Sequence, residues 1–338
     1  MSLIRNQITT FWRYVTKSFT HSILVFTFVF GPHFSQACTV FASKTDGKIK
    51  FVAKNFDWQD GKGSLIYTPA DQLEHQSIEL FGFKWKANLR SLSFHLDANN
   101  DIYNDEHTSE NDNRFPMSGM NEKGLTVEVL LLKGTVYPVT YETQGNRLNQ
   151  LELVRYLLDT ASTITDVRTA LNLINENKLN LENRFKHGLH YITCDLEDCL
   201  VFEFIDGKLK INGGNASLRY LALSNIEYEK GLKALPRYEG FSGTLVRKGP
   251  NPSGRFAIAS WASINSEHSI LNDVFQVLVD AAIKVDASPT QWSYVYEPSL
   301  GVLSIKDTGG ARLLPEMKLD LNTRQETKPV KVSSLLAR

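Results

Sequence analysis

The sequence predicts an α+β domain of antiparallel strands and packed helices rather than a parallel sheet with a helix after every strand. Strand-like segments come in groups that are separated by pairs of helical segments. Asp-Gly pairs at 46–47 and 206–207 supply the tight turns of hairpins. No linker, repeat or low-complexity tract divides residues 38–338, so we expect a single domain there.

The first 37 residues have the pattern of a secretory signal peptide. Arg5, Arg13 and Lys17 precede the apolar run 23–30, and small residues at positions 35 and 37 suit cleavage by signal peptidase. The run is short for a membrane span, and no later apolar stretch is long enough. We therefore expect an exported protein, periplasmic or secreted, that begins at Cys38 and has no stable membrane span.

Two other interpretations of this segment remain open. It could be an uncleaved membrane anchor, or the protein could be a lipoprotein acylated at Cys38. Ser35 disfavours the lipoprotein, because a lipobox usually carries Leu there.

The first group of elements begins with strands at 39–44 and 49–54, joined by the turn 45–48. The polar segment 97–114 has no apolar periodicity and reads as an exposed loop rather than a calcium site. Apolar residues at helical spacing predict a helix over 148–161, and a second helix over 166–174 follows the capping residues Thr163 and Thr165.

The second group repeats this order. We expect strands at 190–193, 200–205, 208–211 and 220–223, helices at 256–264 and 270–285, and closing strands at 292–296, 302–305 and 311–314.

Charge and cysteine content narrow the function. Net charge is zero with scattered Lys and Arg, so the basic patch of a nucleic-acid binder is missing. Of the three cysteines, Cys194 and Cys199 flank the turn 195–198 and could form a disulfide across a hairpin, or could stay two reduced thiols. Cys38 is then the odd thiol, which needs a reason in an oxidising compartment.

A cysteine at a new N-terminus carries its own base. Its α-amino group has a reference pKa of about 7.7–8.0 and lies a few bonds from the thiol. Asp57, at the end of the second strand, could hold this amine, although an Asp there more often caps a turn. The residues around Cys38 show no papain-like signature, and none of the eight histidines is singled out as a base.

An ordered set of motifs resembles the choloylglycine hydrolase family, which includes bile-salt hydrolases and penicillin V acylases and belongs to the N-terminal nucleophile hydrolases. The similarity runs from Cys38 nearly to the C-terminus, and the order of the motifs makes it specific. The motifs are Cys38-Thr39, Lys54-Asn55-Phe56-Asp57-Trp58, Gly119-Met120-Asn121-Glu122-Lys123-Gly124-Leu125, Ser224-Asn225 and Asn251-Pro252-Ser253-Gly254-Arg255-Phe256.

The resemblance implies a four-layer αββα sandwich of two antiparallel sheets, and it implies roles for four residues. Cys38 would attack the amide carbonyl while its α-amine shuttles the proton, and Asp57 would orient that amine. Asn225 would donate to the oxyanion, and Arg255 would favour the thiolate. Taken alone, Arg255 reads as a surface salt-bridge residue and Asn225 as an ordinary turn residue.

Two positions depart from the family pattern. Many bile-salt hydrolases carry Arg where this chain has Lys54, which makes Lys54 a supporting residue. In the strand expected at 125–132, Leu131 aligns with Asn or Tyr of the relatives and can offer an oxyanion only its backbone N–H. We expect Phe56, Trp58 and Leu132 beside it to line an apolar substrate pocket, although each could equally be core.

The leading hypothesis is therefore a cofactor-free, metal-free cysteine amidase acting on small N-acyl amides, such as bile-acid amides, penicillin V or N-acyl homoserine lactones. Homotetramers are common in the resembled family, so a homo-oligomer is an expectation. The alternatives are an exported binding protein or lipoprotein of the same fold with impaired catalysis, and an acid-ceramidase-like lipid amidase.

Overall fold

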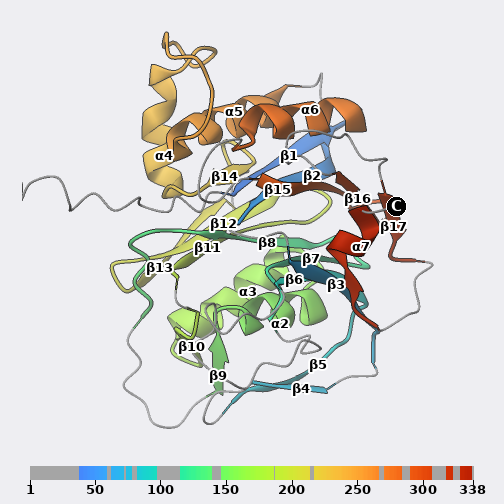
Figure 1. Ribbon diagram of the computed structural model, residues 1–338. Helices are drawn as coiled ribbons and strands as arrows, with labels where there is room; N and C mark the ends of the chain where they lie inside the picture. Colours follow the sequence, from blue (N-terminus) through green and yellow to red (C-terminus); the bar gives the residue numbers. More distant parts are fainter. Residues whose placement is uncertain are drawn as a thin grey trace, which may run out of the picture. The chain divides into compact units, whose positions relative to one another are not determined.

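Two antiparallel sheets lie face to face between two layers of helices (Figure 1). The computed structural model describes residues 38–58, 62–71, 74–77, 82–96, 115–138, 146–185, 187–213, 217–265, 270–283, 290–306, 317–322 and 328–336. These residues belong to one compact unit, Gln36–Arg338. Among them, no helix is both long and apolar enough to cross a membrane.

The first sheet carries the start of the described chain. Its strand order is β14-β1-β2-β15-β16-β17. The strands are β1 (Thr39–Thr45), β2 (Lys48–Asp57), β14 (Ala222–Ser224), β15 (Thr290–Glu297), β16 (Val302–Lys306) and β17 (Met317–Asp320). Strands β1 and β2 form the expected hairpin, with Asp46 and Gly47 both at positive φ in its turn.

The second sheet has the order β13-β12-β11-β8-β7-β6-β3-β18. Its strands are β3 (Gly63–Thr68), β6 (Ser91–Leu96), β7 (Ser118–Asn121), β8 (Thr126–Leu131), β11 (Leu189–Cys194), β12 (Cys199–Ile205), β13 (Lys208–Gly213) and β18 (Val330–Lys331). Short strands outside the two sheets pair as β4 (Glu74–Gln76) with β5 (Lys84–Lys86) and β9 (Asn146–Asn149) with β10 (Leu179–Glu182).

Each sheet is covered on its outer face by helices. Helices α5 (Pro252–Ile264) and α6 (Leu271–Ala281) pack on the first sheet, and α2 (Glu152–Thr160) packs on the second with α3 (Ile164–Asn175) beside it. The remaining helices are α4 (Tyr228–Ala234), the 3₁₀ turn η1 (Leu235–Arg237) and α7 (Val332–Leu336). Helix α3 begins with a capping box between Thr163 and Asp166.

This architecture confirms the predicted α+β class and the four-layer sandwich that the resemblance implied. The predicted segments 97–114 and 311–314 lie outside the described residues. Helix α6 ends at Ala281, earlier than the periodicity predicted. Strand β14 starts at Ala222 rather than at position 220, because both main-chain groups of Tyr220 bond to the hydroxyl of Tyr228.

Candidate active site

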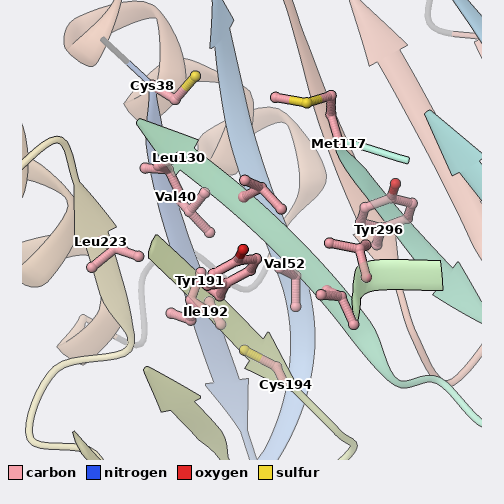
Figure 2. Packing of buried hydrophobic residues seen from close by; sticks show 14 of the residues in the cluster. Cys38, Val40, Val52, Met117, Leu130, Tyr191, Ile192, Cys194, Leu223 and Tyr296 are labelled. Atoms are coloured by element: carbon pink, nitrogen blue, oxygen red, sulfur yellow. The ribbon is translucent and has the colours of Figure 1, made fainter. Parts of the chain in front are cut away.

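The Cys38 side chain faces the layer between the two sheets. Thr39 pairs with Asn55, so Cys38 lies opposite the end of β2, and it alternates in the same direction as Val40. In Figure 2, Cys38 lies towards the top of the drawn part of the apolar cluster and Cys194 towards the bottom. Only 4% of Cys38 is exposed, so the thiol is shielded in the uncleaved chain.

Burial decides the protonation of this thiol. Loss of hydration raises the pKa of Cys38 to about 11, although the positive charges of Lys54 and Arg255 and a hydrogen bond from the Asp57 backbone lower it. The negative charge of Asp57 raises it further. The thiol of the uncleaved chain is therefore protonated at neutral pH.

Asp57 is a buried carboxylic acid whose two oxygens have different surroundings. It closes β2, and its Oδ1 accepts a hydrogen bond from the hydroxyl of Thr290. Its Oδ2 is buried and has no hydrogen-bond partner among the residues that the structure describes. Burial raises the pKa of Asp57 to about 7, against the lowering effects of the Thr290 hydrogen bond and of the Arg255 and Lys54 charges.

Thr290 fixes which oxygen of Asp57 stays open. The backbone N–H of Ile283 donates to Thr290 Oγ1 at 2.9 Å, so the hydroxyl proton of Thr290 is directed at Asp57. Thr290 is buried at the start of β15, far from Asp57 in the sequence. It carries no local motif, and the sequence analysis missed it.

Lys54 connects the two sheets close enough to Cys38 for its charge to act on the thiol. Its Nζ lies 3.0 Å from Glu128 Oε2 and donates to the Val129 carbonyl at 2.8 Å, and both side chains are buried. The same Glu128 oxygen accepts from the Tyr294 hydroxyl at 2.8 Å. Burial raises the pKa of Glu128, while Lys54 and Tyr294 lower it. Lys54 thus places a positive charge at a fixed position. The sequence analysis did not predict its partner, Glu128.

Asn225 and Arg255 form a connected pair at the end of β14. Arg255 Nη2 donates to Asn225 Oδ1 at 3.3 Å, and Asn225 Nδ2 donates to the Leu131 carbonyl at 2.7 Å. Leu131 therefore offers its carbonyl to Asn225, a contact that the sequence did not predict. One Nδ2 proton of Asn225 is used in this way, and the amide has a second to donate.

The start of α5 places the Arg255 guanidinium in the interior. Asn251 caps the helix by accepting from the N–H of Gly254, and Pro252 occupies the first turn. A Cβ on Gly254 would collide with the Lys248 carbonyl, so this position needs glycine. Arg255 is fully buried and donates to the Pro250 carbonyl, which excludes its interpretation as a surface residue.

The predicted pocket residues are all buried. Phe56 stacks on Trp292 with ring centroids 4.7 Å apart and is part of an aromatic cluster. Trp58 meets the exposed ring of His187 edge to face at 6.3 Å. The Leu132 N–H donates to the Gly188 carbonyl. Trp58 directly follows the last residue of β2, so this aromatic pair lies next to Asp57 in the sequence.

Other chemistry in the described part of the chain is limited. A disulfide joins Cys194 and Cys199 across the β11–β12 hairpin. Within the described ranges, no three His, Cys, Asp or Glu side chains gather as a metal-binding group. The side chains around Cys38 can supply a nucleophile, a carboxylate that accepts a cation, an amide donor and fixed positive charge.

Comparison with known proteins places the chain in a family. The family match and the fold define a class of hydrolase that acts on linear amide C–N bonds. Residues 38–250 match the family model described as linear amide C–N hydrolases, choloylglycine hydrolase family, and the chain belongs to this family. A comparison with curated proteins finds no match.

Two solved structures share the fold at low sequence identity. Penicillin V acylase from Agrobacterium tumefaciens is 20% identical, with a TM-score of 0.64 and coverage of 85% of this chain and 86% of that one. A mutant of conjugated bile acid hydrolase from Clostridium perfringens is 16% identical, with a TM-score of 0.65 and coverage of 87% and 96%.

Proposed function

We propose that this protein is an exported amidase whose nucleophile is the thiol of Cys38, released as the N-terminal residue when the segment ending at Ala37 is removed. Its substrates are small N-acyl amides of the penicillin V, conjugated bile acid or N-acyl homoserine lactone type. The buried, unpartnered Oδ2 of Asp57 carries this proposal. A buried carboxylate oxygen without a partner is costly, and a cation beside it removes the penalty.

Release of the α-amine would supply that cation. In the reaction, the neutral α-amine takes the thiol proton and the sulfur attacks the acyl carbon. The tetrahedral oxyanion accepts a hydrogen bond from the Asn225 amide N–H. The α-ammonium then protonates the departing nitrogen as the C–N bond breaks. Water, deprotonated by the same amine, cleaves the thioester and regenerates the thiol.

Lys54 and Arg255 support this chemistry by lowering the pKa of the thiol. In this proposal, the buried apolar side chains of Phe56, Trp58 and Leu132 line the substrate pocket, which suits an aliphatic or aromatic acyl group. The second candidate is a binding protein with impaired turnover. Cys38, Asp57, Asn225 and Arg255 are all present, which favours the enzyme. Arg255 donates a hydrogen bond to Asn225 and lowers the pKa of both Cys38 and Asp57.

The test is a hydrolysis screen of the mature protein against glycocholate, penicillin V and acyl homoserine lactones. We expect acid release from at least one substrate class and none from Cys38→Ala. Intact mass separates a free Cys38 terminus from an acylated terminus and from the unprocessed chain. Turnover by a protein with an unbroken Ala37–Cys38 bond would overturn the mechanism, because the α-nitrogen would then be an amide.

A further inference from the structure

A buried acid–base pair lies on the second sheet, outside the residues assigned above. His190 on β11 and Glu203 on β12 face each other in register, with His190 Nδ1 3.0 Å from Glu203 Oε1. At most 2% of either side chain is exposed. Burying a carboxylate is unfavourable unless hydrogen bonds or a paired charge offset its loss of hydration, so the burial of this pair requires an explanation.

Glu203 holds the first residue of helix α4. Its Oε1 also accepts the backbone N–H of Tyr228 at 3.0 Å. The residue at the N-cap of α4, Glu227, makes no side-chain capping bond, and its carboxylate pairs with Lys230 instead. A strand of the second sheet therefore provides the acceptor that a capping residue normally provides.

Tyr228 lies three residues after Asn225, so this bond fixes one end of a short turn. The other end is fixed by the first sheet and α5, since Ser224 pairs with Thr39 and its hydroxyl donates to the Pro252 carbonyl at 2.7 Å. Only the Tyr228 end depends on Glu203.

We propose that Glu203, oriented by His190, is a positioning residue that sets the placement of the Asn225 amide for the oxyanion. This inference rests on the proposed function, in which Asn225 is the side-chain donor. Electrostatic stabilisation of an oxyanion depends on donor geometry, and small displacements of a catalytic group lower the rate strongly. Glu203 thus acts on turnover through the Tyr228 N–H and the turn 224–228.

The test compares two carboxylates of the same kind. Glu152, buried at the start of α2, also accepts a backbone N–H, from Asn149 at 2.9 Å, but it lies on the other side of the second sheet. We expect Glu203→Ala to lower kcat by about tenfold with little change in KM, and Glu152→Ala to lower Tm while kcat stays within about twofold.

Graded variants keep the test decisive if Glu203→Ala does not fold. Glu203→Gln keeps an acceptor oxygen and should retain kcat within about twofold, whereas Glu203→Asp keeps the charge but withdraws the oxygen and should lose about three- to fivefold. Equal kcat for the Asp and Gln variants would overturn the proposal.

A double-mutant cycle separates this inference from the proposed function. In an Asn225→Ala background, Glu203→Asp should cause no further loss of kcat, because the donor it positions is gone. If Asn225→Ala itself keeps full kcat, the oxyanion assignment fails. If Asn225→Ala is impaired and Glu203→Asp lowers kcat equally in both backgrounds, only the positioning role fails.

Discussion

Asp57 and Asp159 are both fully buried carboxylates, but their surroundings differ. Asp159 Oδ1 forms an ion pair with Arg155 Nη2 at 2.7 Å without hydrogen-bond geometry, and Oδ2 accepts a hydrogen bond from Trp85 Nε1 at 2.7 Å. Within the described ranges, Asp57 accepts a side-chain hydrogen bond from Thr290 on one oxygen, and its other oxygen has no hydrogen-bond partner. The contacts of Asp159 with Arg155 and Trp85 join α2 to β5. Asp57 differs, because its Oδ2 can still accept a hydrogen bond from a cationic group.

The largest expected effect comes from replacing these two acids. Asp57→Asn should lower kcat by about 1000-fold, because the amide no longer orients an ammonium, and should leave Tm unchanged or raised. Asp159→Asn should leave kcat nearly intact but destabilise the fold by about 3–5 kcal/mol, because Arg155 loses its buried partner. Steady-state kinetics and thermal unfolding measure both. Similar stability losses in the two variants would break the comparison.

A smaller loss is expected at the oxyanion donor. Asn225→Ala should lower kcat by about 100-fold, roughly 2.7 kcal/mol of transition-state stabilisation, with a smaller change in KM. Asn121 is the matched control, because its Nδ2 also donates to main-chain carbonyls, those of Leu158 and Ala161. Asn121→Ala should lower Tm and leave kcat within about threefold. Near-normal kcat in Asn225→Ala would refute its assignment.

Substitution of Lys54 tests whether a side chain that is already in an ion pair also lowers the pKa of the Cys38 thiol. Lys54→Met should lower the thiolate population and leave Glu128 uncompensated, which costs about 3–5 kcal/mol of stability. The double variant Lys54→Met, Glu128→Leu should regain stability by removing the unpaired acid, yet kcat should stay about tenfold low. Recovery of activity together with stability would show that Lys54 has no electrostatic role.

The smallest effect concerns Thr290. Its hydrogen bond lowers the pKa of Asp57, so Thr290→Val should raise that pKa and move the acid limb of kcat/KM to higher pH. Above this limb, where Asp57 is ionised in both proteins, kcat should stay within about threefold of wild type. Thr68, which accepts from Arg155 at 3.2 Å in the other cluster, is the control. Thr68→Val should leave the profile in place, and an unmoved limb in Thr290→Val would contradict the assigned contact.

The sequence predicted local structure where local signals are strong. The Asp46-Gly47 turn defines the β1–β2 hairpin, and Thr163 marks the start of α3. The short strand β14 and helix α4 were not predicted in this form, because their limits depend on contacts such as the one from Glu203 to Tyr228. Pairing order within the sheets likewise depends on segments far apart in the chain.

The candidate site shows the same division. Cys38, Asp57, Asn225 and Arg255 stand in short motifs whose order makes them recognisable, so they could be named from the sequence. Thr290 and Glu128 have no such setting, since a single Thr or Glu in a strand carries no signal of its partner. Their roles are apparent only in the folded structure. There, β15 pairs with β2 and brings Thr290 to Asp57, and Glu128 of β8 in the other sheet pairs with Lys54 of β2.

The high pKa of the buried Cys38 thiol also bears on its survival before use. At a pKa of about 11, roughly one thiol in ten thousand is ionised at pH 7, and thiolate is the form that oxidants and disulfides attack. A chain still carrying residues 1–37 should resist alkylation by iodoacetamide and should not exchange with the Cys194–Cys199 bridge. In the exported enzyme that we propose, burial would then keep the Cys38 thiol protonated and unreactive until residues 1–37 are removed.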